Sequence, residues 1–159
     1  MNEKHTISCL VENHFGVLAR VSSLISARGF NIDSLTVSVT EDPTISRMTI
    51  VVDADAVKLE QVKRQLDRLI DVIDVKELSE GQFIDRELLL ARVTCDGAKR
   101  SELERVAAQF GGKVASATDH AVVVEVAGDT KALDQLVERL RAYGIEKLVR
   151  TGRVALEKQ

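Results

Sequence analysis

The fold is decided by residues 5–39, which read HTISCLVENHFGVLARVSSLISARGFNIDSLTVSV. Residues 5–11 alternate between apolar and polar positions, so they predict a strand. After a short turn, apolar residues recur at helical spacing, and Gly29 marks the expected end of that helix. Residues 30–39 predict a second strand. The stretch therefore predicts a strand, a turn, a helix and a strand in close succession.

The pattern continues over the rest of the first half of the chain. Residues 40–44 contain the single proline of the sequence and predict a turn. Apolar alternation resumes around Met48 and predicts a third strand. A helix is expected to begin at Asp53 or Asp55, and residues 72–78 predict a fourth strand. The order of elements is therefore βαββαβ.

Residues 87–159 predict the same βαββαβ order, although the two halves share few identical residues. We therefore expect an α+β protein made of two successive ferredoxin-like units, each an antiparallel sheet with two helices on one face. The predicted boundaries are residues 1–78 for the first unit, residues 79–86 for a polar linker and residues 87–159 for the second unit.

The second predicted strand, Phe30 to Val39, is expected at an edge of its sheet, because the strands of this fold lie in the spatial order 4-1-3-2. An apolar edge strand invites pairing with another chain. Two copies paired through this strand would form one eight-stranded sheet with two-fold symmetry. The pairing would bring residues 12–18 of one copy near the second strand of the other.

The composition excludes several classes of function. The net charge is −3, and residues 1–78 carry 9 basic and 12 acidic side chains, so neither nucleic acid nor an anionic membrane is an expected partner. One RNA-binding fold shares the βαββαβ order, but it needs stacking aromatic residues on its first and third strands, and residues 7–11 and 47–52 contain none. Cys9 and Cys95 stand alone, which indicates free thiols in a reducing compartment and a cytoplasmic protein.

The sequence offers no pattern typical of an enzyme. The three histidines, His5, His14 and His120, fall in separate segments without ligand spacing, so no metal site is expected. Neither a phosphate-binding glycine loop nor a nucleophile elbow occurs. No apolar run reaches the length of about 20 residues that a membrane span needs. We therefore expect a protein without catalytic residues of its own.

The turn at residues 12–18 is the one candidate site. Gly16 allows either a positive φ or the close approach of a ligand to the backbone. The helix that follows presents free N–H groups, which suit a carboxylate. Asn13 and Asn31 offer both hydrogen-bond donors and acceptors. The alternative interpretation is purely local: Asn13 and Gly16 form the turn, and Asn31 bonds to its neighbours.

Four stretches carry a resemblance to a known family. VENHFGVLARV at residues 11–21 and RGFNIDSLTV at residues 28–37 resemble an ACT domain, the amino-acid-sensing module of biosynthetic enzymes. EDPTISRMTI at residues 41–50 and RELLL at residues 86–90 resemble, more narrowly, the small regulatory subunits of acetolactate synthase. The resemblance covers nearly the whole chain, including its length and its two-unit plan.

The resemblance implies a non-catalytic subunit in the biosynthesis of the branched-chain amino acids valine, isoleucine and leucine. It implies a homodimer formed through the edge strand Phe30–Val39. It further implies binding and activation of a large catalytic subunit, and feedback inhibition by valine. Thiamine diphosphate, magnesium and FAD are expected on that large subunit, and no cofactor is expected in this chain.

The family's effector positions fall on eight residues: Asn13, His14, Phe15, Gly16, Val17, Leu18, Asn31 and Ile32. Many members have smaller residues where His14 and Phe15 stand, so the size of Phe15 leaves the particular effector open. The alternative is an ACT-type sensor of another amino acid, coupled to a different enzyme or regulator. Residues 95–99 do not match this turn, so no effector site is expected in the second unit.

Overall fold

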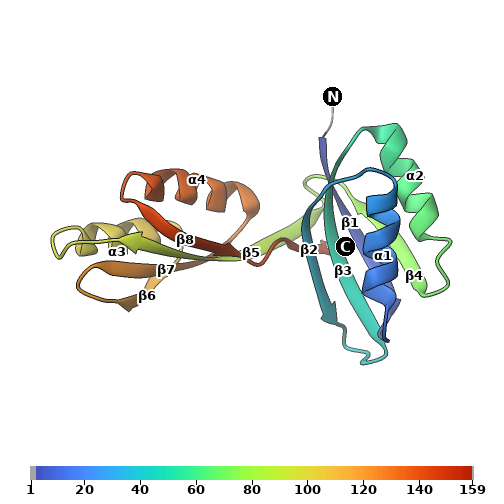
Figure 1. Ribbon diagram of the computed structural model, residues 1–159, viewed down its shortest axis with the longest axis horizontal. Coiled ribbons are helices and arrows are strands. Elements are labelled where there is room, and N and C mark those ends of the chain that lie inside the picture. Colours follow the sequence, from blue (N-terminus) through green and yellow to red (C-terminus); the bar gives the residue numbers. More distant parts are fainter. Residues whose placement is uncertain (1–2, 159) are drawn as a thin grey trace. The chain divides into compact units, whose positions relative to one another are not determined.

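The structure is a computed structural model that describes residues 3–158. The chain divides into two units. The first unit comprises the residues up to Ile84 together with the stretch that begins at Arg153, and the second comprises Asp85–Gly152. Figure 1 shows the elements of each unit along the chain.

The first unit has the predicted βαββαβ order, and its sheet has the predicted strand order. Its elements are β1 (Glu3–Glu12), α1 (Val17–Ala27), β2 (Ile32–Val39), β3 (Ile45–Ala54), α2 (Ala56–Leu66) and β4 (Val72–Leu78). The strands pair antiparallel in the order β2-β3-β1-β4, so β2 lies at an edge. Both helices cover one face of this sheet (Figure 1). The ferredoxin-like prediction is confirmed for this unit.

The core of the first unit follows from the alternation of β1. Ile7 and Cys9 are fully buried, and they pair in register with Ile50 and Met48 of β3. Buried residues of the two helices, including Val21 and Leu59, pack against this strand face. Burying an aliphatic side chain of this size stabilises the fold by about 1.5–3 kcal/mol. The absence of tryptophan is therefore compensated by closely packed aliphatic residues.

The second unit repeats the architecture. Its elements are β5 (Phe83–Thr94), α3 (Arg100–Gln109), β6 (Lys113–Ala117), β7 (Ala121–Gly128), α4 (Thr130–Arg141) and β8 (Ile145–Arg150). The strand order β6-β7-β5-β8 is equivalent to that of the first unit. Leu89 of β5, Leu103 of α3 and Leu133 of α4 share one buried cluster, which joins the sheet to both helices. The second ferredoxin-like unit is confirmed as well.

The boundaries between the units differ from those that the sequence predicts. The predicted linker, residues 79–86, is only partly a linker, because β5 begins at Phe83. Residues 153–158 belong to the first unit and not, as expected, to the second. They include β9 (Val154–Glu157), which pairs with β5.

Polar contacts hold this C-terminal segment on the first unit. The Arg153 backbone N–H donates to Ser34 Oγ over 2.9 Å, and Thr36 Oγ1 donates to the Arg153 carbonyl over 2.7 Å. The Arg153 guanidinium donates to Thr6 Oγ1 over 2.6 Å. The partners are hydroxyl groups on β1 and β2, and hydroxyl groups leave no apolar pattern in a sequence. This is why the sequence does not predict the docking.

Among residues 3–158, no helix has both the length and the apolar character that a membrane-crossing helix requires.

Candidate functional site

The turn between β1 and α1 is built around Gly16. Gly16 is the N-cap residue of α1 and has φ +85°, in the left-handed region. A Cβ atom at this position would lie 3.0 Å from Arg20 Nη1, which is tighter than ordinary contact. Of the two roles expected for this glycine, the positive φ is confirmed.

The N-terminus of α1 is left without a side-chain cap. Its first intrahelical hydrogen bond runs from Arg20 N–H to the Gly16 carbonyl over 3.1 Å. The amides of Val17, Leu18 and Ala19 come before that bond and have no partner within the helix. They lie at the positive end of the helix dipole, so the turn can accept a carboxylate.

Asn13 connects this turn to the loop before β3. Its backbone N–H donates to the Thr44 carbonyl over 2.7 Å, and its Nδ2 donates to the Pro43 carbonyl over 2.9 Å. Part of the local interpretation is therefore correct, because the Asn13 amide does help to form the turn. The side chain is also exposed, and an amide carries an oxygen acceptor in addition to its donors.

Asn31 and Ile32 lie at the other end of the sheet. Ile32 pairs with Val52 of β3, whereas Glu12, next to the turn, pairs with Ile45. These two β3 positions are seven residues apart, or roughly 20 Å along a strand. Asn31 is exposed and donates from Nδ2 to Asp33 Oδ1 over 2.8 Å. One chain therefore does not bring Asn13 and Asn31 together.

Exposed apolar side chains lie along the edge strand and at the start of α1. Val37 and Val39 of β2 are 39% and 51% exposed, and Leu18 of α1 is 44% exposed. Val37 pairs with the buried Met48, so it lies on the sheet face that the helices cover. Phe15, in the turn itself, is fully exposed. This end of the unit presents apolar surface beside a row of edge hydrogen-bonding groups.

The sequence did not predict one cluster at the same turn. His14 Nε2 lies 2.9 Å from Glu12 Oε2 and 3.2 Å from Asp71 Oδ1, and Arg20 Nε donates to Asp71 Oδ2 over 2.6 Å. Asp71 is distant in sequence, but the Glu12 backbone N–H donates to its carbonyl over 2.8 Å, because β1 and β4 are neighbours. The predicted strand order is the signal that could have placed Asp71 here.

The charges in this cluster change the pKa values of its members. The hydrogen bond to Glu12 raises the pKa of His14 above its ordinary value, with help from the Phe15 carbonyl and from the charge of Asp71. The hydrogen bond from Arg20 lowers the pKa of Asp71, assisted by the positive charges of Arg20 and His14. Both shifts favour the charged forms, so the cluster holds opposite charges close together.

The corresponding turn of the second unit is built differently. Asp96 Oδ1 accepts a hydrogen bond from the Lys99 N–H over 3.1 Å, and Lys99 precedes α3 in a right-handed conformation. No glycine with positive φ stands at this N-cap. A turn with a left-handed glycine thus precedes the first helix of the first unit, and the structure shows no equivalent between β5 and α3.

A βαββαβ unit with a glycine-capped helix N-terminus and an apolar edge strand is of the ACT type, a class of regulatory modules. Two family models match this chain: "AHAS small subunit-like ACT domain" over residues 7–74 and "Small subunit of acetolactate synthase" over residues 86–159. The chain belongs to the acetolactate synthase small subunit family, as the resemblance predicts.

Individual relatives agree with this assignment. The probable acetolactate synthase small subunit of Archaeoglobus fulgidus is 45% identical over 153 residues, which cover 96% of each chain. The isozyme 3 small subunit of Escherichia coli K12 is 39% identical and covers 98% of this chain and 96% of its own. The crystal structure of the acetolactate synthase small subunit from Thermotoga maritima superimposes with a TM-score of 0.89 at 30% identity, covering 99% of this chain and 98% of that one.

Proposed function

We propose that this chain is the regulatory subunit of acetolactate synthase, that it binds and activates the large catalytic subunit, and that it confers feedback inhibition by valine. The names of the relatives support a small-subunit role in a larger enzyme. One observation carries the effector proposal: the open N-terminus of α1 and Asn31 lie at opposite ends of one sheet. A site that uses both needs two chains.

Pairing of two β2 edges meets this requirement. When two copies of β2 run antiparallel, the beginning of one strand lies beside the end of the other. Val39, at the end of β2, pairs with Ser46, and Ser46 pairs with Val11 near the turn. Asn31 of one copy would therefore approach the Asn13–Gly16 turn of the other. The dimer would also cover the exposed apolar edge of each chain.

Valine has groups that suit this composite site. Its carboxylate would accept hydrogen bonds from the first amides of α1, which no side chain caps. Its ammonium group would donate to the Asn13 or Asn31 oxygen or to nearby carbonyls. Its isopropyl group would lie against exposed apolar residues of α1 and β2, such as Leu18 and Val37. The size of Phe15 makes another amino acid the alternative effector.

Inhibition follows if valine binds one state of the enzyme complex more tightly than the other. A coupling free energy of about 1–3 kcal/mol is the usual scale for such regulation. In this scheme the chain contributes no catalytic group, and thiamine diphosphate, magnesium and FAD act on the large subunit. Both cysteines are free and buried, which suits a cytoplasmic location.

The test is an acetolactate assay on the large subunit, with and without this chain and with and without valine. We expect activation by the wild-type chain, inhibition by valine, and loss of that inhibition in Gly16→Asp, because an anion would stand where the effector carboxylate binds. Gly111→Asp is the matched control, since Gly111 also has a positive φ, of 75°, in open space in the second unit.

Calorimetry with valine gives the deciding measurement. An unchanged valine affinity in Gly16→Asp would contradict the proposed site. A thermal-shift screen of the twenty amino acids separates the two effector hypotheses: a shift with another amino acid and none with valine would favour the alternative sensor.

A further inference from the structure

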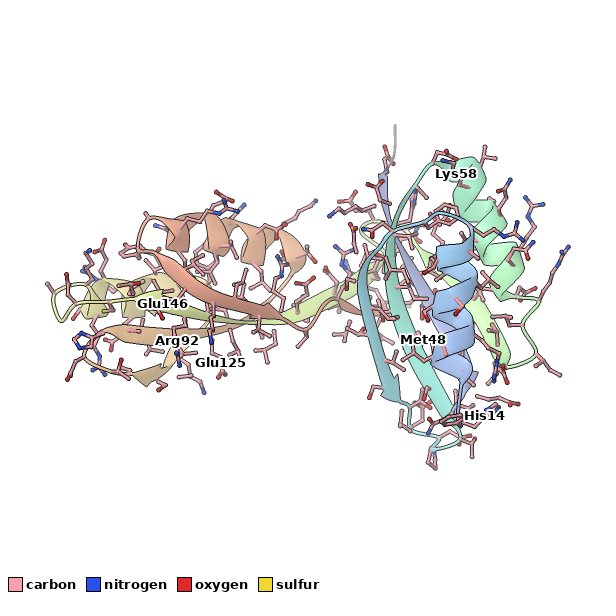
Figure 2. The ribbon with its side chains drawn as sticks, in the orientation of Figure 1. His14, Met48, Lys58, Arg92, Glu125 and Glu146 are labelled. Carbon is pink, nitrogen blue, oxygen red and sulfur yellow. The ribbon has the colours of Figure 1, made fainter. Side chains whose placement is uncertain are left out.

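Three side chains at the β1–α1 turn direct possible metal-ligand atoms toward one point. Glu12 and His14 come from the end of β1 and the turn, and Asp71 comes from the residue before β4. One ligand atom from each, the His14 nitrogen and two carboxylate oxygens, lies within 4.8 Å of the others. Figure 2 labels His14 at this end of the first unit, where α1 begins.

In the metal-free protein, a proton on His14 joins these atoms. Carboxylate oxygens only accept hydrogen bonds. His14 Nδ1 lies 3.4 Å from the Phe15 carbonyl, a contact that favours the proton on Nδ1. Nε2 faces Glu12 and Asp71, 2.9 and 3.2 Å away, and as the second N–H of a charged imidazole it donates to them. A metal ion that displaces the Nε2 proton would meet one imidazole lone pair and two carboxylate oxygens at this point.

The cluster is held in place by its surroundings. The Asp71 side chain is only 7% exposed, and Arg20 fixes its second oxygen through the 2.6 Å bond to Oδ2, which leaves Oδ1 directed at His14. The backbone bond from Glu12 N–H to the Asp71 carbonyl fixes the two acidic residues relative to each other. Such outer contacts on a histidine and on a carboxylate are typical of metal ligands.

A second histidine in the same unit shows the contrasting arrangement. His5 Nδ1 lies 3.1 Å from Glu77 Oε1, and Lys63 Nζ donates to the other oxygen of Glu77 over 3.1 Å. There an ammonium group supplies the positive charge. At the β1–α1 turn, Arg20 bonds to the far oxygen of Asp71, so Oδ1 of Asp71 faces His14 and can take a metal ion in place of the His14 proton.

We propose that Glu12, His14 and Asp71 bind one divalent transition-metal cation of the zinc, cobalt and nickel class. One imidazole nitrogen and two carboxylate oxygens, completed by water, suit these ions, whereas magnesium and calcium prefer oxygen ligands alone. The ion would fix the turn that carries Phe15 and Gly16. Histidine spacing could not reveal this site, because the third ligand, Asp71, lies in the connection between α2 and β4, far from His14 in sequence. The inference rests on geometry and is independent of the effector.

Titration of the untagged, chelator-treated full chain tests the proposal. We expect one Zn²⁺ per chain by calorimetry and a visible absorption band on addition of Co²⁺. Because loss of an outer-shell contact alone weakens metal binding about 10–100-fold, His14→Gln should weaken Zn²⁺ binding at least about tenfold. Glu12→Gln should weaken it as well. Both residues are about half exposed, so these variants are expected to fold, which circular dichroism checks.

The other histidines provide matched controls. His5→Gln and His120→Gln each remove one imidazole and should bind Zn²⁺ as the wild type does. Wild-type protein that binds neither Zn²⁺ nor Co²⁺ would overturn the proposal, and so would a His14→Gln variant with wild-type affinity. Since no large subunit or valine is present, the result does not depend on the proposed regulatory function.

Discussion

The two units differ most in the turn that leads into their first helix. Their second helices begin in the same way: Asp55 accepts from the Lys58 N–H before α2, and Asp129 accepts from the Ala132 N–H before α4, each over 2.8 Å. The first helices do not, because Gly16 leaves α1 uncapped whereas Asp96 closes the turn before α3. The shared capping maintains the fold, whereas the first helices follow different turns: a left-handed glycine before α1 and a turn closed by Asp96 before α3.

The similarity of the two aliphatic cores is tested by truncating an equivalent core residue in each unit. Leu59 of α2 and Leu133 of α4 are almost completely buried. We expect Leu59→Ala and Leu133→Ala each to lower the free energy of unfolding by about 2–5 kcal/mol, because each leaves a cavity in an aliphatic core. Urea unfolding measures the change. A loss below about 1 kcal/mol in one variant would show that the two cores are not packed equally well.

The difference between the two turns is tested by replacing one glycine in each turn with alanine. Gly16→Ala should destabilise the protein by about 1–2 kcal/mol, because a residue with Cβ disfavours the left-handed conformation. Gly97, in the turn before α3, has no positive φ, and a Cβ there would meet open space. Gly97→Ala should change the stability by at most about 1 kcal/mol. Thermal melts compare the two variants. Equal losses of stability would show that the left-handed conformation of Gly16 does not distinguish the two turns.

The smallest expected effect concerns the two buried thiols, Cys9 and Cys95. Burial, with the charge of Asp74, raises the pKa of Cys9 to about 12. The folded thiol therefore keeps its proton at pH values where the unfolded thiol ionises, and stability should fall as the pH rises above about 9. Labelling with a thiol reagent at pH 8 should be slow for Cys9 until denaturant is added. Rapid labelling of native Cys9 would contradict its burial.

Much of the fold could be predicted because its signals are local. Alternation in β1 and helical spacing in α1 identify the faces that must be buried, and together they lead to the observed strand order. The conformation of Gly16 was predictable for the same reason. The position of Asp71 beside His14 was not, because it depends on where two distant strands meet.

Two further features could not be predicted from the sequence, for different physical reasons. The sequence identifies Asn31 as a polar residue at the boundary of a predicted element. Its distance from Asn13, however, depends on the register of β2 against β3. The docking of Arg153, just before β9, uses hydroxyl groups of Ser34, Thr36 and Thr6, whose polar character also fits an exposed sheet face. Polar contacts between distant segments leave no periodic signal, so a structure was needed to find them.

The return of residues 153–158 to the first unit has a consequence for biosynthesis. In sequence, Asp85–Gly152 is an insertion within the first unit. A ribosome therefore finishes the whole second unit before it makes the segment that bonds to Thr6. A nascent chain that has reached Gly152 holds every residue of the second unit, while its first unit still awaits Arg153. The first unit, although it starts first, is the last to be completed.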